Sequence, residues 1–390
     1  MAGERTADRS TASIWSYKFV FLLLTVFANN IIMTMMMPVI PMYIEKLGAA
    51  KSLSGVVVGV FTFTALFCRP FWGKLIDTWS RKIVTIAGCI FAAAACFSYH
   101  LAESVALLLL IRIIHGIGFS AVTNATATMA ADMVPAERRS EGLGYYGAAF
   151  AASLALGPAL SMKIYNSLSM SAVFTIAGII MLAGLLFAAF TGRVKESAGY
   201  GNKNAKQSVI EITALPDSVL MAIIAFNYVA VMTFVPSYAI SLGLGSMSSF
   251  FLIYSAALIL CRTFVGKFTD KHGMNVVIIP GIILMSASFV CLAAASGKVP
   301  FMIAAVLFGA GYGTVQPTLN AIIISKCRPE RRGAANATFL MAMDLGLGIG
   351  AIIWGIVSGS YSYAAVYWSG LVIFVISLLY AAALNKKTEG

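Results

Sequence analysis

The sequence is poor in charged residues. Only 11% of its 390 residues are Asp, Glu, Lys or Arg, whereas 60% are hydrophobic; soluble domains average about 25% charged. A soluble core cannot enclose that much apolar surface, so the composition excludes a pair of soluble domains, a secreted enzyme and a nucleic-acid-binding protein. One membrane-spanning helix needs roughly 20 apolar residues, which leaves room for about twelve spans and little else.

Several chemical motifs are also missing. The six cysteines form no Cys-x-x-Cys pair, so we expect neither a disulfide framework nor a metal site. No Gly-x-x-x-x-Gly-Lys-Ser/Thr loop occurs, so ATP is not the expected energy source. Because there is also no Ser-His-Asp set, the sequence predicts a protein that is not an enzyme and has no cofactor.

Long apolar runs dominate the chain instead. They predict helices, because backbone in lipid must satisfy its own hydrogen bonds. The expected spans are 18–42, 53–76, 83–101, 105–129, 141–164, 169–191, 217–241, 248–268, 275–296, 299–325, 333–358 and 363–384. The polar segment 192–216 predicts a cytoplasmic linker between an N-terminal bundle, 1–191, and a C-terminal bundle, 217–390.

Basic residues predict the orientation. Twenty of the 27 Lys and Arg lie on the side of the N-terminus, and only Lys46, Lys51, Lys163 and Lys298 lie on the other. The positive-inside rule then places both termini in the cytoplasm and accounts for the net charge of +12. We expect a multi-pass protein of the plasma (inner) membrane of a prokaryote.

The two halves of the sequence repeat at a fixed offset of 193 residues. The matched positions are Cys68-Arg69 with Cys261-Arg262, Gly73-Lys74 with Gly266-Lys267, Asp77 with Asp270, Gly116 with Gly309, Gly118 with Gly311, Glu137–Arg139 with Glu330–Arg332, and Gly157 with Gly350. Charged and glycine matches argue against chance similarity among apolar helices. The repeat predicts an all-α membrane fold, in which two six-helix bundles are related by a pseudo-twofold axis along the membrane normal.

The matched loops resemble a known family. The stretch Gly73-Lys-Leu-Ile-Asp77-Thr-Trp-Ser-Arg81-Lys82 resembles the loop signature of the major facilitator superfamily, and Gly266-Lys-Phe-Thr-Asp270-Lys-His-Gly is a weaker copy. The span 4 sequence Arg112-Ile-Ile-His-Gly116-Ile-Gly118 is similar to a second motif of that family. Pro38-Val-Ile-Pro41 and Gly157-Pro158 are similar to motifs of its 12-span drug–proton antiporter branch, although Ser161 stands at a later glycine position.

The resemblance implies transport by alternating access, with a cavity between spans 1, 2, 4, 5 and spans 7, 8, 10, 11. It also implies a conformational latch that holds the cytoplasmic side closed, formed by Gly73, Asp77, Arg81, Lys82 and Asp270. Asp77 can pair with Arg81 or cap a helix end. The alternative is an ordinary loop salt bridge, which contributes little when exposed.

Ionisable residues inside the spans are the candidates for proton coupling. Asp344 is the single acid deep within a span; we expect a proton or cation site, or else a carboxylate that caps a backbone distorted by nearby glycines. Arg112 and His115 predict a proton relay or a substrate contact, unless Arg112 only braces helices through carbonyl groups. Arg69 and Arg262 lie near the cytoplasmic ends of their spans, where we expect them to snorkel.

Amphipathic side chains are the candidates for substrate binding. They are Asn29, Asn30, Met33, Asn124, Tyr146, Phe226, Asn227, Tyr228, Tyr254, Gln316, Asn320 and Trp354. Methionines cluster around Met33, and their flexible thioethers suit a permissive pocket, although packing filler explains any single one equally well.

Two functions stay open. The first is proton-coupled efflux of small amphipathic or cationic molecules, based on the antiporter-like motifs and Asp344. The second is an importer or uniporter of an organic anion or small metabolite, with Arg112 binding a carboxylate. A receptor or scaffold has no feature in its favour. We expect a small-molecule substrate, the lipid bilayer as the other partner, no nucleic acid, a monomer, and a proton gradient as the energy source.

Overall fold

The structure is a computed structural model that describes residues 14–78, 80–134, 138–192, 210–272, 275–328 and 331–389. Twelve long helices account for most of these residues, and each is long and apolar enough to cross a membrane. They are α1 Tyr17–Lys46, α2 Ser52–Thr78, α3 Arg81–Ser98, α4 Val105–Met133, α5 Arg139–Ser167, α6 Met170–Phe190, α7 Leu215–Ser241, α8 Ser248–His272, α9 Asn275–Ala293, α10 Lys298–Lys326, α11 Arg332–Ser360 and α12 Tyr363–Glu389. Each expected apolar run forms one helix, so the prediction of twelve spans is confirmed.

Short polar segments determine where the helices begin. Ser16, Ser104 and Ser169 are N-caps whose hydroxyl oxygens accept hydrogen bonds from backbone N–H groups three residues later, at 3.1–3.3 Å. After α1 and α7 the chain turns at Gly48 and Gly243, whose φ angles of 69° and 72° favour glycine. Local chemistry therefore divides a nearly continuous apolar sequence into separate spans.

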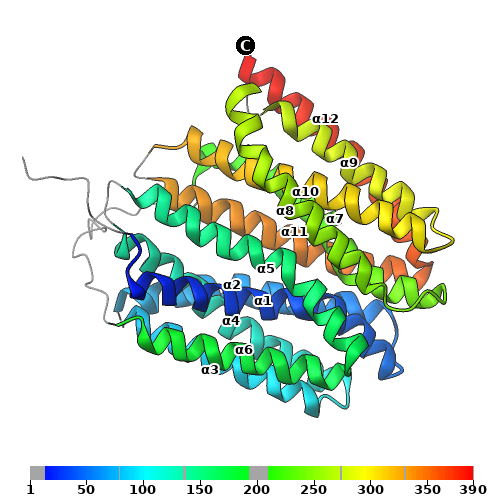
Figure 1. The fold of residues 1–390 in the computed structure, drawn as a ribbon, viewed down its shortest axis with the longest axis horizontal. Coiled ribbons are helices and arrows are strands. Elements are labelled where there is room, and N and C mark those ends of the chain that lie inside the picture. The colour runs from blue at the N-terminus through cyan, green and yellow to red at the C-terminus, as the bar shows by residue number, and fades with distance from the viewer. Residues whose placement is uncertain are drawn as a thin grey trace, which may run out of the picture.

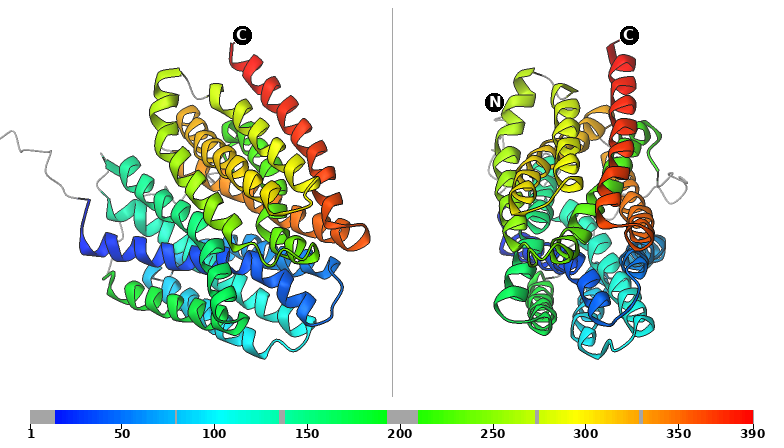
Figure 2. Two further views of the ribbon diagram at one scale, coloured as in Figure 1. Left: turned by 45° about the vertical axis from the view of Figure 1, so that its right-hand side comes forward. Right: turned by 90° about the vertical axis from the view of Figure 1, so that its right-hand side faces the viewer.

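The helices form two bundles, the N half (α1–α6) and the C half (α7–α12), which lie side by side in Figures 1 and 2. Across the boundary α2 packs along α11, α5 along α8 and α1 along α7. The main contacts of α3, α6, α9 and α12 are within their own halves. The space between the halves is consequently bordered by the inner helices that carry the candidate residues.

A short segment connects to the start of the C half and is held by α11. The 3-10 helix η3, Ile212–Ala214, precedes α7, and the backbone N–H of Glu211 donates to the Thr338 hydroxyl at 2.9 Å. Arg331 Nε donates to Glu211 Oε2 at 2.7 Å, and this hydrogen bond holds the pKa of the Glu211 carboxyl below its usual range. One arginine of the repeated Glu-Arg-Arg motif thus ties the segment to its own half.

The halves meet tightly at the end opposite the termini, which we call the external end on the basis of the charge distribution. A Cβ atom on Gly355 would lie 2.7 Å from Gly55 Cα, so α2 and α11 touch backbone to backbone. Nearby, the Tyr363 hydroxyl donates to the Glu45 carboxylate. This end of the boundary between the halves is therefore closed.

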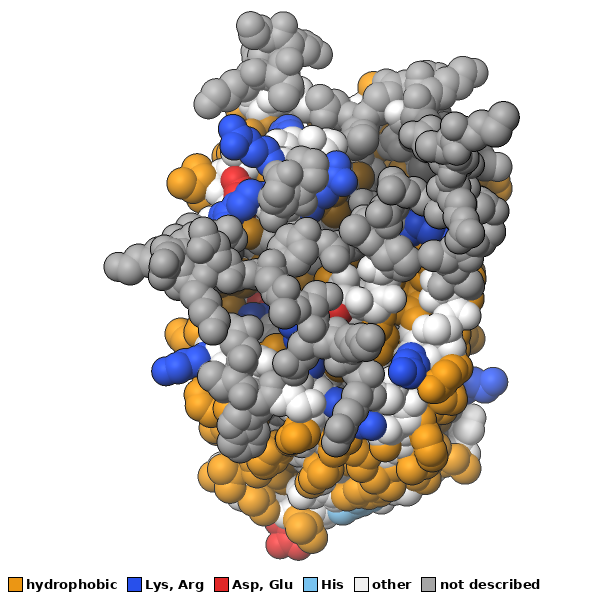
Figure 3. Space-filling view, turned by 90° about the vertical axis from the view of Figure 1, so that its left-hand side faces the viewer, with side chains coloured by type: hydrophobic (Ala, Val, Ile, Leu, Met, Phe, Trp, Pro, Cys, Tyr) orange, Lys and Arg blue, Asp and Glu red, His pale blue; other side chains and the backbone are white. Residues whose placement is uncertain are grey.

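Toward the cytoplasmic end several glycines of α2, α5 and α11 have no close neighbour. A Cβ atom on Gly73, Gly144, Gly147 or Gly333 would meet no other atom within 4 Å. In Figure 1 the two bundles converge toward the right and diverge toward the left, and Figure 3 shows the Lys and Arg side chains that gather at this diverging end. The structure is consequently inward-facing.

Replacing a closely packed glycine by alanine should affect stability differently from replacing a glycine that has no close neighbour. Gly355→Ala places a methyl group against the backbone of α2, so we expect the protein to lose about 1–3 kcal/mol of stability. Gly144→Ala, the matched control, adds its methyl in open space and improves helix propensity, so stability should be unchanged or higher. Thermal unfolding in detergent measures both, and equal melting temperatures would contradict close α2–α11 contact.

Candidate functional site

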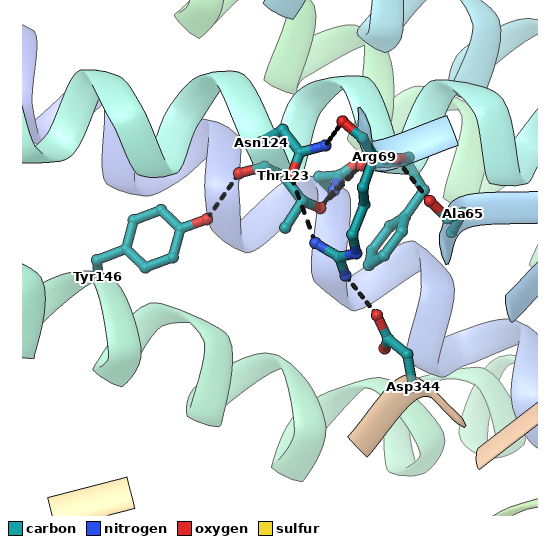
Figure 4. Close-up of polar contacts among 9 residues, drawn as sticks. Ala65, Arg69, Thr123, Asn124, Tyr146 and Asp344 are labelled. Carbon is teal, nitrogen blue, oxygen red and sulfur yellow. Dashed lines mark hydrogen bonds and ion pairs between the residues drawn. The ribbon is translucent and has the colours of Figure 1, made fainter. Parts of the chain in front are cut away.

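The centre of the site is an ion pair between the halves. Arg69 Nη2, on α2, donates to Asp344 Oδ2, on α11, and the two side chains are only 14% and 10% exposed (Figure 4). Since a guanidinium stays charged, each group neutralises the other away from bulk water. The structure therefore corrects two expectations: Asp344 is not a lone carboxylate, and Arg69 does not snorkel to the membrane surface.

Asn124 contacts this pair directly, and further polar contacts continue from its neighbour Thr123 to two other helices. On α4, Asn124 Oδ1 accepts a hydrogen bond from Arg69 Nη1 at 3.4 Å, and its amide donates to the Arg69 carbonyl, also at 3.4 Å. On α5 the Tyr146 hydroxyl donates to the Thr123 carbonyl at 3.3 Å (Figure 4). On α1 Asn29 Nδ2 donates to the Thr123 hydroxyl at 3.3 Å. Polar contacts thus connect α1, α2, α4 and α5 to α11.

This arrangement can couple protonation of Asp344 to movement of the two halves relative to each other. The ion pair Arg69–Asp344 joins the halves, whereas Arg81–Asp132, Arg138–Glu141, Lys326–Asp217 and Arg331–Glu211 each lie within one half. Protonation of Asp344 removes one charge and with it the Coulombic attraction, which is strong in a low-dielectric site. Asn124 Oδ1 still accepts a hydrogen bond from Arg69, but a neutral amide does not replace the lost counter-charge.

Arg112 and His115 lie elsewhere, inside the N half. Arg112 Nε donates to the Val57 carbonyl at 3.2 Å, and its guanidinium carbon lies 4.3 Å from the centroid of the Phe61 ring. His115 Nδ1 lies 3.1 Å from the Tyr99 hydroxyl, and both Arg112 and His115 are at most 1% exposed. Arg112 precedes Asn124 by twelve residues, about 18 Å along α4, so the structure does not bring these two residues to Asp344.

Several candidate substrate contacts are occupied within one half. Asn227 donates to the Gly370 carbonyl on α12 at 2.8 Å, so it faces an outer helix and is wrongly predicted to line the cavity. Asn30 Nδ2 donates to the carbonyl of Val26 in its own helix at 2.8 Å, and its role in substrate binding stays a prediction. Trp354 Nε1 donates to the Phe226 carbonyl at 2.7 Å and braces α11 against α7.

The other candidates stay near the inner helices. Met33 is buried in α1, and Asn320 Nδ2 donates to Asn336 Oδ1 at 3.1 Å, between α10 and α11. Gln316 accepts a hydrogen bond from Arg262 Nη2 at 2.5 Å, so Arg262 points toward α10 and does not snorkel as expected. Tyr254 is fully buried.

The motif residues are only partly described. Arg81 forms an ion pair with Asp132 on α4, and Lys82 Nζ donates to the Ala189 carbonyl at 2.5 Å. Gly73 faces open space, whereas the side chains of Asp77 and Asp270 lie outside the described residues. The latch therefore stays a prediction.

The antiporter-like motif in α5 marks a close helix crossing. A Cβ atom on Gly157 would overlap the side chain of Thr34 on α1, and Pro158 lies within the helix. The Thr34 hydroxyl donates to the Ser153 carbonyl on α5 at 2.9 Å, one turn before Gly157. A glycine at position 157 thus allows α1 and α5 to touch.

Sequence reasoning missed Arg69 because it lies near the end of its span. Arg69 is nine residues from the end of α2, about 13 Å along the helix axis. A side chain at that depth reaches the membrane surface less easily than one in the last turn. This depth in the span is one sequence feature that could have indicated a functional role for Arg69. Its match to Arg262 in the internal repeat is a second.

The ion pair predicts non-additive stability effects. Arg69→Met leaves Asp344 without its counter-charge, so we expect a loss of about 3–5 kcal/mol, the usual result of breaking a buried pair from one side. The double variant Arg69→Met/Asp344→Leu leaves no buried charge and should recover most of that loss. Denaturation of both purified variants in detergent tests this, and additive losses would show that the pair is not coupled.

Comparison with known proteins agrees with this architecture. A family model described as Major Facilitator Superfamily matches residues 22–339 and 218–389. The staphylopine export protein of Staphylococcus aureus is 23% identical over 97% of this chain and 98% of its own length, and the multi-drug resistance efflux pump PmrA homolog of Lactococcus lactis is 23% identical over 91% of each. The crystal structure of the nucleoside transporter NupG superposes with a TM-score of 0.72 at 14% identity, over 96% of this chain and 99% of that one. The chain therefore belongs to the Major Facilitator Superfamily, as a multi-pass secondary transporter and not an enzyme.

Proposed function

We propose that the protein is a proton-coupled exporter of small amphipathic or cationic molecules, with Asp344 as the proton-carrying group and Arg69 as its counter-charge. The observation that carries the proposal is the ion pair that joins α2 to α11 across the two halves. The names of two relatives, an export protein and a multi-drug efflux pump, support the outward direction of transport.

The cycle follows from the charges. In the inward-facing arrangement the ion pair with Arg69 forms when a proton carried by Asp344 is released toward the cytoplasm. When the external end opens, Asp344 takes up a proton from outside and its attraction to Arg69 is lost. Each turn of the cycle then brings one proton in while substrate leaves, because the two access states differ in how well they bind the proton.

The second candidate function is an importer or uniporter of an organic anion that Arg112 binds. Contacts with Val57 and Phe61 enclose Arg112 in the N half, where its guanidinium is not offered to the space between the halves. A uniporter also has no need of a titrating carboxylate at the boundary. The position of Asp344 therefore favours the first function.

Coupling can be tested with Asp344→Asn, which imitates the protonated form and cannot titrate. In reconstituted vesicles with an imposed pH gradient, we expect gradient-driven transport of fluorescent amphipathic dyes to fall at least tenfold, while dye exchange without a gradient continues. Asp344→Glu should keep part of the activity with a shifted pH profile, because it restores a carboxyl group in a different position.

Asp217→Asn is the matched control. Asp217 is also buried and accepts a hydrogen bond from Lys326 Nζ at 2.7 Å, but both residues belong to the C half. This variant should keep its coupling. Gradient-driven transport at the wild-type rate in Asp344→Asn would remove Asp344 from the mechanism, and an equal loss in Asp217→Asn would indicate general damage to the fold.

A further inference from the structure

Arg262 occupies the position in the C half that Arg69 occupies in the N half, but its surroundings differ. Arg69 has Asp344 as its counter-charge, whereas the residue that corresponds to Asp344 in the N half is Ala151. Among the described residues, no carboxylate forms an ion pair with Arg262. Its hydrogen bond is to the amide oxygen of Gln316, and its Nε is buried without a partner.

Arg262 on α8 and Gln316 on α10 each lie at the cytoplasmic end of a row of side chains, and the two rows face each other. On α8, Tyr254 and Arg262 lie two turns apart on one face, and on α10, Tyr312 and Gln316 lie one turn apart. Both helices run from the external to the cytoplasmic end, so the polar residues are nearer the cytoplasm. The guanidinium therefore lies on the side of its aromatic neighbours where the halves have separated.

The aromatic part of the rows is closely packed. It consists of Tyr228, Tyr254, Phe308 and Tyr312, which we call the aromatic cluster. The rings of Tyr228 and Tyr312 stack at 4.3 Å, and Tyr254 lies 6.2 Å from Phe308. All four are at most 1% exposed, whereas Arg262 is partly exposed. The cluster is therefore a packed, buried layer on the external side of Arg262.

A guanidinium in this position needs a partner. It cannot lose its proton, and a charge removed from bulk water is costly without an opposite charge. The amide of Gln316 is neutral, so it satisfies one N–H group but not the charge. A carboxylate satisfies both, because its two oxygens match the fork of the guanidinium, and the amide N–H₂ of Gln316 offers two further donors.

We propose that Arg262 and Gln316 bind the carboxylate of an amphipathic substrate, whose apolar part lies toward the aromatic cluster. The two arginines of the repeat then have different roles: Arg69 is neutralised by the protein's own acid and Arg262 by the substrate. The proposal deepens the proposed function by selecting amphipathic carboxylates, and not cations, from its two substrate classes. It rests on that function for the path of the substrate between the halves.

The test is binding of three pyrene probes that differ in one group, namely 1-pyrenebutyrate, its neutral amide and 1-pyrenebutylamine. Fluorescence titration of the purified full-length protein in detergent at pH 7 needs no gradient. We expect the carboxylate to bind at least tenfold more tightly than the amide, and the ammonium compound to bind most weakly. Arg262→Gln should reduce affinity for the carboxylate to that for the amide.

Two further variants separate charge from packing. Gln316→Glu places an internal carboxylate beside the guanidinium and should abolish the preference for pyrenebutyrate. Arg262→Lys keeps the charge but not the fork, so part of the preference should remain. Affinity for the neutral amide should change less than twofold in all three variants, which shows that the fold is kept.

Equal binding of the three probes by the wild type would overturn the proposal, as would binding of none, or a carboxylate preference that survives in Arg262→Gln. The result is independent of proton coupling. A preference that depends on Arg262 in a protein without gradient-driven transport upholds this site and rejects the proposed function. Gradient-driven transport that depends on Asp344, in a protein with no carboxylate preference, upholds the proposed function and rejects this site.

Discussion

A carboxylate that lies away from water is costly without a counter-charge, and here that requirement connects the two halves of the molecule. The ion pair between Arg69 and Asp344 satisfies it by joining α2 to α11. Backbone contact at Gly55 and Gly355 holds the same two helices together at the external end, whereas the two bundles diverge toward the cytoplasmic end (Figure 1). Protonation of a single carboxylate therefore acts on the contact between the halves, which is where alternating access requires movement.

The functional features lie where the internal repeat is broken. Arg69 and Arg262 are equivalent, but an aspartate is opposed to the first and Ala151 stands at the matching place for the second. In the same way Phe61 and Phe119 of the N half correspond to Tyr254 and Tyr312 of the C half. The two halves thus share one scaffold and differ in a few polar side chains. In our proposals Asp344 beside Arg69 binds the proton, and Arg262 binds the substrate carboxylate.

Part of the site could be predicted from the sequence and part could not. Asp344 was recognisable because a carboxylate deep in a span is costly unless it has a function. Asn29, Asn124, Tyr146 and Gln316 were recognisable as polar groups on inner spans. Arg112 was equally conspicuous, yet it is held by a carbonyl group and a ring inside one half. The sequence alone cannot distinguish a site residue such as Asp344 from a residue such as Arg112 that is held within one half, because each is a polar group on a buried helix face.

The sequence by itself determined the twelve helices, their repeat and the family, because apolar length, an offset of 193 residues and the loop signature from Gly73 to Lys82 are properties of the chain. Only the tertiary structure decided which charges meet. Position 69 lies 275 residues from position 344, and no local pattern records a pairing over that separation. The pairing depends on how two bundles pack and on which end has closed, and packing of that kind is a property of the whole fold.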